Sequence, residues 1–185
     1  MEDLLKLTVI NKLKSVYRAN SVGNRKESSA EHSWSCLILA DYFLTKLNIK
    51  LNKEKVYELL MYHDMVEIYA GDSALHPELE HVDKKEREEI AANELKKALP
   101  EAIANKYHNT FMEYEVAKTP EAKFAKAIDS FDAILHEYDY KVDWKGWSKQ
   151  FVINKKEINF KEFPLLLDEF HKIINHLEKE GYFNQ

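Results

Sequence analysis

The sequence contains 185 residues, of which 45% are hydrophobic, with only four glycines and four prolines. A chain of this length and composition is typical of one globular domain, and because it has few residues that break helices or build sheet turns, we expect it to be mostly helical. The formal net charge of −5 argues against a nucleic-acid surface, and the single cysteine, Cys36, excludes a disulfide framework or a cysteine-rich zinc site.

The N-terminal part is predicted to hold two helices separated by an irregular segment. The first helix is expected from about Glu2 to Lys14, and segment 15–29, rich in serine, asparagine and arginine, is expected to be irregular. The second helix is predicted to begin near Ser28 or Ser29, where Glu31 allows a capping box. Its buried face is marked at helical spacing by Trp34, Leu37, Ala40, Leu44 and Leu47.

Four further helices are expected in the central part of the chain. One is capped by Asn52 and extends until Gly71, and segment 76–83 links it to a charged helix that begins near Asp83. The next two start at Pro100 and Pro120, the positions where proline favours a helix N-terminus. The buried face of the last is predicted to contain Phe124, Ile128, Phe131, Leu135 and Tyr138.

The C-terminal part is predicted to be less regular before a closing helix. Segment 140–159 shows no clear period, and its Trp144 and Trp147 are expected to pin a loop to the core or to a partner subunit. An amphipathic helix is expected over residues 160–179. No repeat or linker interrupts the sequence, so the prediction is one all-α domain spanning residues 1–185.

A cluster of charged residues, MYHDMVEIYAGD at positions 61–72, contains the most chemistry. His63 and Asp64 are adjacent, and Glu67 and Asp72 follow closely. On a continuous α-helix, His63 and Glu67 share one side and Asp64 lies about 100° round, so the histidine and Asp64 can converge on one ion. An adjacent His–Asp pair is by itself more typical of a solvated helix end.

Two distant positions strengthen the case for a metal site. His32 lies in the first turn of a predicted core helix, although a capped surface histidine is also common there. Asp129 follows Ile128 on a predicted buried face, where an unpaired carboxylate is costly unless a cation or a basic side chain lies beside it.

These segments resemble the HD superfamily of metal-dependent phosphohydrolases, and in particular its 5'-deoxynucleotidase-like branch. The similarity lies in SSAEHSW, MYHDMVEIYAGD and AIDSFDAIL, and it covers roughly residues 13–140. It implies a single HD-domain helical bundle with a C-terminal helix at about 160–180, and a homodimer. One divalent metal ion, of Mn, Co, Mg, Zn or Fe, would be bound by His32, His63, Asp64 and Asp129. Asp132 is a rival ligand, less favoured because it falls outside the motif.

The resemblance also assigns residues to the substrate. Glu67 would donate a proton to the leaving ribose oxygen or position the attacking water, and Asp72 would contact substrate or water. Arg18 and Arg25 are the candidate phosphate contacts, since a guanidinium fork suits phosphate oxygens. The chain departs from its bacterial relatives at Ala19, where they carry an aromatic residue that helps to select deoxyribose. Tyr17 or segment 20–24 is the alternative candidate for the part of the pocket wall that contacts the sugar.

We therefore expect a hydrolase of nucleoside 5'-monophosphates, with a preference for the deoxy form. The expected partner is a small-molecule nucleotide, with no nucleic acid and no membrane, because no apolar run approaches the ~18 residues of a membrane span. A cytoplasmic location is expected. A phosphodiesterase of the same superfamily is one alternative, and a non-catalytic helical module held by a structural metal is another; Glu67 and Asp72 argue against the second.

Overall fold

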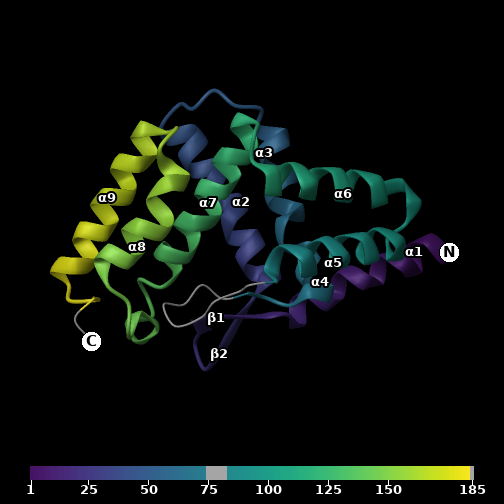
Figure 1. Ribbon diagram of the computed structural model, residues 1–185, viewed down its shortest axis with the longest axis horizontal. Helices are drawn as coiled ribbons and strands as arrows, with labels where there is room; N and C mark the ends of the chain where they lie inside the picture. The colour runs from purple at the N-terminus through teal and green to yellow at the C-terminus, as the bar shows by residue number, and fades with distance from the viewer. Residues whose placement is uncertain (74–82, 184–185) are drawn as a thin grey trace.

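The computed structural model describes residues 1–73 and 83–183, and its architecture is mostly α-helical (Figure 1). The α-helices are α1 (Glu2–Lys6), α2 (Ser29–Lys46), α3 (Lys53–Tyr62), α4 (Glu67–Ala70), α5 (Lys84–Ala98), α6 (Glu101–Val116), α7 (Pro120–His136), α8 (Lys149–Lys156) and α9 (Pro164–Lys179). Short 3₁₀ helices are η1 (Leu7–Ser15), η2 (His63–Val66), η3 (Lys141–Trp144) and η4 (Glu157–Phe160). The predicted all-α class is confirmed. None of the described helices is long and apolar enough to cross a membrane.

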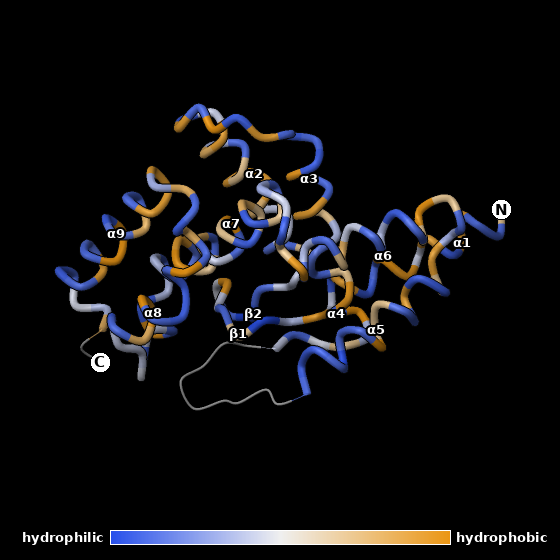
Figure 2. Tube along the Cα trace, turned by 45° about the horizontal axis from the view of Figure 1, so that its top comes forward, coloured by the Kyte–Doolittle hydropathy of each residue, from blue (hydrophilic) through white to orange (hydrophobic). Residues whose placement is uncertain are grey.

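Two hydrophobic clusters share the core. The larger joins α2, α3 and α7 to the C-terminal elements, and the smaller joins η1 and η2 to α5 and α6. In Figure 1, α8 and α9 lie at one end of the molecule and α1, α5 and α6 at the other, with α2, α3 and α7 between them. Figure 2 shows hydrophilic and hydrophobic positions alternating along α9, as an amphipathic helix that covers one side of the larger cluster requires.

Several predicted helix ends are confirmed. Ser28 caps α2 in a complete capping box with Glu31, and Asn52 caps α3 by accepting a hydrogen bond from the backbone of Lys55. Pro120 occupies the first turn of α7, and Gly71, with a φ of 72°, ends α4. Local side-chain chemistry therefore sets these boundaries.

The prediction that segment 15–29 is irregular is wrong. Most of the segment forms an antiparallel hairpin of strands β1 (Tyr17–Val22) and β2 (Arg25–Ser28), in which Val22 pairs with Arg25 across the Gly23–Asn24 turn. The hairpin is anchored to the helices: Asp143 accepts hydrogen bonds from the backbone and hydroxyl of Ser21 at 2.7 and 2.9 Å. The N-terminal helix also differs, since α1 is short and η1 continues it in 3₁₀ geometry.

Three residues assigned to buried faces are exposed. Trp34 is 66% exposed, Leu135 44% and Tyr138 41%, whereas Ala40, Leu44, Phe124, Ile128 and Phe131 are buried as predicted. Helical spacing identifies which residues form the apolar stripe of a helix, but it does not show how much of that stripe the neighbouring helices cover. The tryptophans of the less regular segment, Trp144 and Trp147, are both buried.

Candidate active site

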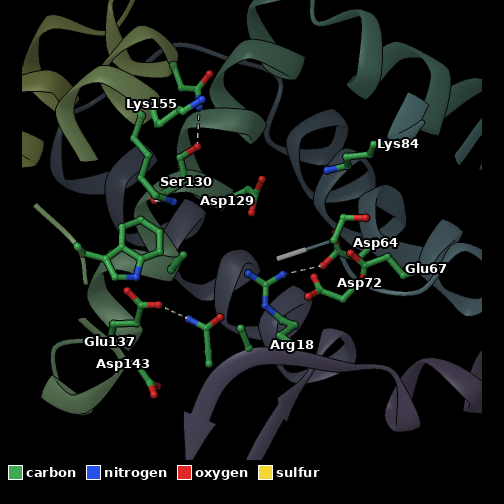
Figure 3. A pocket seen from close by; sticks show the side chains of 17 residues that line it. Arg18, Asp64, Glu67, Asp72, Lys84, Asp129, Ser130, Glu137, Asp143 and Lys155 are labelled. Atoms are coloured by element: carbon green, nitrogen blue, oxygen red, sulfur yellow. Dashed lines mark hydrogen bonds and ion pairs between the residues drawn. The ribbon is translucent and has the colours of Figure 1, made fainter. Parts of the chain in front are cut away.

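A cavity of about 480 Å³ opens beside β1 and α7. It is lined by residues of β1, of the segment from η2 to Ser73, and of α5, α7, η3, α8 and η4. Figure 3 shows the carboxylates of Asp64, Glu67 and Asp72 gathered around Arg18 on one side, with Lys84 nearby. Asp129 lies between this group and Glu137, which lies at the far side. The cavity is thus strongly polar, with both signs of charge.

The turn that carries His63 and Asp64 is wound differently from the prediction. The α-helix stops at Tyr62, and η2 follows before α4 begins at Glu67. Because a 3₁₀ helix has about three residues per turn, positions three apart share a side. Asp64 and Glu67 therefore both line the cavity, rather than His63 with Glu67, while His63 remains buried beneath them.

All four predicted metal ligands lie close together, with Asp64 and Asp129 lining the cavity and the two histidines buried beside them. Nε2 of His32 lies 3.0 Å from Asp129 Oδ1 and 3.9 Å from Asp64 Oδ2, and Nε2 of His63 lies 3.2 Å from Asp64 Oδ1. The two imidazole rings are 5.5 Å apart between centroids. The tyrosine hydroxyl of Tyr114 donates to Asp129 Oδ2 at 2.8 Å and holds that carboxylate in place.

The second nitrogen of each histidine is occupied elsewhere. Nδ1 of His63 donates to the backbone carbonyl of Leu60 at 2.8 Å, and Nδ1 of His32 contacts Asp132 Oδ2 at 2.8 Å. A neutral ring with its proton on Nδ1 presents a lone pair on Nε2. This is how histidine ligands are usually oriented, with an outer carboxylate or carbonyl fixing the tautomer. Asp132, the rival ligand, occupies that outer position.

Electron-pair donors thus face one another across a gap that a cation would fill. Nε2 of His63 is buried and makes no hydrogen bond among the described residues, although a carboxylate oxygen of Asp64 lies close to it. Two imidazole nitrogens and two carboxylates suit a first-row divalent ion. Without a cation, burial opposes protonation of His32, but its electrostatic interaction with Cys36 and its hydrogen bonds to Asp129 and Asp132 raise its pKa well above the ordinary value. A proton on His32 then compensates part of the carboxylate charge that a cation would otherwise compensate.

Cys36 is a neighbouring donor that the sequence did not single out. Its sulfur lies 3.5 Å from Nε2 of His32, and His32, Cys36 and His63 have ligand atoms within 4.8 Å of one another; a second such group is Glu27, His32 and Asp132. Neither group includes Asp64 or Asp129, the carboxylates that reach the cavity. Burial raises the pKa of the Cys36 thiol to about 12, and Nδ1 of His32 is already engaged, so the cavity-facing set is the better candidate. The spacing from His32 to Cys36, about one helical turn, was the sequence signal that could have identified Cys36 as a neighbour of His32.

The two predicted catalytic carboxylates both line the cavity. Glu67 is buried, and Ser29 Oγ donates to it at 2.5 Å. Burial and the negative charge of Asp64 raise the pKa of Glu67 to about 8, against the opposing effect of the Ser29 hydrogen bond. Burial also raises the pKa of Asp72, although Arg18 opposes this. Glu67 is therefore placed to hold a proton at neutral pH.

The raised pKa of Glu67 leads to a prediction about stability in the metal-free protein. Because its pKa is higher in the folded state than the ordinary 4.5, folding is favoured most below about pH 4.5, and this contribution is lost as pH rises through about 8. Glu67→Gln cannot ionise, so its free energy of unfolding should fall less between pH 5.5 and 8.5 than that of the parent, by roughly 2–4 kcal/mol. Urea unfolding in excess chelator measures the difference; parallel pH curves would show that Glu67 is not held in its neutral form.

The two predicted phosphate contacts have different positions. Arg18 lies inside the cavity with its Nη1 3.5 Å from Asp64 Oδ2 and its Nε 3.3 Å from Glu27 Oε2, and that Nε is buried without a well-aligned hydrogen bond. Arg25 does not line the cavity. It pairs with Glu31 of the capping box on the exposed surface, so the geometry gives no support to a phosphate contact at Arg25.

Lys84 is a cavity cation that sequence reasoning missed. It lies in the first turn of α5 and pairs with Glu88 at 3.5 Å. Burial lowers its pKa, but the charges of Glu88, Glu115, Asp129 and Glu67 outweigh this and raise it. In the sequence it is one of many lysines of a charged helix, so nothing local distinguished it. His76 and His81, part of the predicted link before α5, lie outside the described residues.

Comparison with known proteins agrees with this geometry. A model of the HD domain family matches residues 10–166. A solved structure described as a "predicted metal-dependent phosphohydrolase" from Magnetospirillum magnetotacticum MS-1 superposes with a TM-score of 0.84 at 30% identity, over 97% of this chain and 92% of the other. A conserved hypothetical protein from Pyrococcus furiosus superposes with a TM-score of 0.70 at 27% identity, over 94% and 99% of the two chains.

Curated relatives carry the name 5'-deoxynucleotidase. The human protein HDDC2 is 31% identical over 137 residues, which cover 72% of this chain and 66% of the relative. The protein hdd1 of Schizosaccharomyces pombe is 31% identical over 129 residues, which cover 66% of this chain and 62% of the relative. The match therefore spans just under two thirds of the length of each of these two relatives.

Proposed function

The chain belongs to the HD domain family, and on that premise we propose that it is a metal-dependent phosphohydrolase that releases inorganic phosphate from nucleoside 5'-monophosphates, as a 5'-deoxynucleotidase does. The names of the curated relatives support the substrate class. The observation that carries the proposal is the pair of histidine Nε2 atoms that face the carboxylates of Asp64 and Asp129 at a cavity containing Arg18.

The proposed cofactor is one divalent ion held by His32, His63, Asp64 and Asp129. A bound ion of this kind lowers the pKa of a coordinated water and compensates charge on the phosphoryl group. Two imidazoles favour Mn, Co, Zn or Fe over Mg, which prefers an all-oxygen shell. Asp132, Tyr114 and the Leu60 carbonyl would keep the ligands oriented.

The remaining residues of the cavity are assigned to substrate and protons. Arg18, with Lys84 on the other side of the carboxylates, binds the phosphate oxygens. Glu67, which holds a proton near neutral pH, donates it to the ribose oxygen as the phosphorus–oxygen bond breaks. Asp72, facing the same space, orients the attacking water or the substrate.

Release of inorganic phosphate tests this proposal. The chelated protein would be assayed on a panel of deoxynucleoside and ribonucleoside 5'-monophosphates and on a cyclic nucleotide, with and without added Mn, Co, Mg or Zn. The expected result is metal-dependent phosphate release from the monophosphates alone. Opening of the cyclic ester would instead indicate the phosphodiesterase, and metal binding without turnover would indicate the non-catalytic helical module.

Sugar selectivity is predicted to be weak because Ala19 lines the cavity where the bacterial relatives carry an aromatic residue. A pocket that only tolerates an added hydroxyl discriminates by about 10²-fold or less. The kcat/KM values of dAMP and AMP should therefore differ modestly, and Ala19→Trp should widen the difference in favour of dAMP. If the parent protein strictly rejects AMP, another residue must exclude the 2'-hydroxyl of the ribose. Asn20, which lines the cavity, is better placed to do this than Tyr17, which does not line it.

A homodimer and a cytoplasmic location are part of the proposal. Trp34, Ile38 and Tyr42 form an exposed stripe along α2, at 66%, 58% and 50% exposure, and an apolar stripe of this kind is typical of a helical interface. Ile38→Asp should shift the mass measured by light scattering from dimer to monomer, whereas Ile90→Asp, at an exposed position of α5, should not. Cys36, buried and unpaired, is consistent with a reducing compartment.

A further inference from the structure

The cavity extends well beyond the proposed metal ligands, along one face of α7. Asp129 and Ala133 of this helix and its C-cap residue Glu137 all line it, and they are spaced four residues apart. At 1.5 Å per residue, Glu137 lies about 12 Å along the axis from Asp129. The small side chain of Ala133 leaves the space between them open. A sugar ring followed by a base has the length to cover this span.

The far end has side chains from three separate elements. Glu137 Oε1 accepts a hydrogen bond at 3.1 Å from Asn20 Nδ2, which belongs to β1, and Asp143 belongs to η3. Lys156, from α8, also lines the cavity, where its ammonium donates to the Ser130 carbonyl at 3.3 Å and its charge acts on Glu137. Figure 3 shows Glu137 and Asp143 on the opposite side of the cavity from Asp64, Glu67 and Asp72.

Glu137 is the acidic group at this end with acceptor capacity to spare. Both oxygens of Asp143 are taken by the backbone and hydroxyl of Ser21. For Glu137, by contrast, Oε2 makes no hydrogen bond among the described residues. Burial raises the pKa of Glu137 to about 7, partly offset by Lys156, so the carboxylate is largely ionised by pH 8. An ionised carboxylate only accepts hydrogen bonds, and so it selects a ligand that donates them.

We propose that Glu137, positioned by Asn20, recognises the base of the nucleotide and favours bases that present an exocyclic amino group over those that present a carbonyl at the same position. This assignment rests on the proposed function, because the phosphate must lie at Asp64 and Asp129 for the base to reach Glu137. The preferred substrates are then cytosine and adenine nucleotides, with uracil and thymine nucleotides disfavoured.

The sharpest comparison uses dCMP and dUMP. At C4 of the base, dCMP carries an amino group and dUMP carries a carbonyl. At pH 8 the parent should hydrolyse dCMP with the higher kcat/KM. Glu137→Gln supplies an amide that can donate to the carbonyl, so the ratio of the two kcat/KM values should fall by about tenfold or more, the usual effect of changing a hydrogen bond to a charged group. Deoxyribose 5-phosphate, which has no base, should be turned over equally by both proteins.

Controls separate this inference from the proposed function. Glu162→Gln changes an exposed glutamate that does not line the cavity and should leave the ratio unchanged. Absence of phosphate release from every ester would contradict the proposed function, and calorimetric binding of dCMP and dUMP to the chelated protein would then decide the base preference. An unchanged ratio in Glu137→Gln, or equal binding of the two nucleotides by the parent, would overturn the assignment of Glu137.

Discussion

Asp64→Ala should lose the metal ion, whereas Glu67→Gln should keep it and lose turnover. Asp64 contributes one of the two carboxylates that face the histidine nitrogens, so its removal should weaken metal binding by more than the ~10–100-fold cost of losing an outer partner. Glu67 is assigned only to proton transfer, so Glu67→Gln should lower kcat by about 10²–10⁴-fold at unchanged metal affinity. Metal titration and phosphate release on the same preparations give both quantities.

Cys36→Ala is the matched control for this prediction. The thiol lies beside His32 but outside the cavity-facing set, so the variant should retain both metal and activity. Equal loss of metal in Asp64→Ala and Glu67→Gln would show that Glu67 is a ligand. Loss of metal in Cys36→Ala would instead favour the buried group of His32, Cys36 and His63.

Arg18→Ala should abolish most phosphate recognition without emptying the metal site. Its guanidinium is the closest basic group to Asp64 inside the cavity, and a hydrogen bond to a charged group contributes about 1.5–3 kcal/mol, or roughly 10–150-fold in kcat/KM. Arg18→Lys should recover only part of this loss, because an ammonium keeps the charge but lacks the planar fork.

Inhibition by inorganic phosphate checks the Arg18 assignment independently of turnover. The inhibition constant should rise in Arg18→Ala by a factor similar to the loss in kcat/KM, while metal affinity stays the same or increases, since Asp64 loses a competing cation. Arg25→Ala, at the exposed pair with Glu31, is the comparison and should change neither quantity. A loss confined to metal affinity would contradict a phosphate contact at Arg18.

The sequence was most informative about features that depend on local side-chain chemistry. Helix starts at Ser28, Asn52 and Pro120 follow from side chains that act within one turn, and they are confirmed. The prediction that His32, His63, Asp64 and Asp129 share one site agrees with their proximity, although metal binding itself stays a prediction. The order of the motifs along the chain was sufficient for this prediction, because each of the four residues lies near a helix end or on a helix face that packs against the core.

Features that depend on tertiary packing were not accessible in the same way. The hairpin at 17–28 is held partly by Asp143, more than a hundred residues away, and only its Gly23–Asn24 turn gave a local signal. The change to 3₁₀ winding after Tyr62 reversed which of His63 and Asp64 faces the cavity with Glu67. Glu137 gave no signal either, since a glutamate near the end of a helix is usually solvated.

The most direct test of this account is a crystal structure of the metal-loaded protein with data at the absorption edge of the metal. The anomalous peak should lie within about 2.0–2.4 Å of His32 Nε2, His63 Nε2 and one oxygen each of Asp64 and Asp129, with Asp132 still bonded to Nδ1 of His32. A peak at Cys36, or one with Asp129 turned away from the ion, would contradict the proposed site.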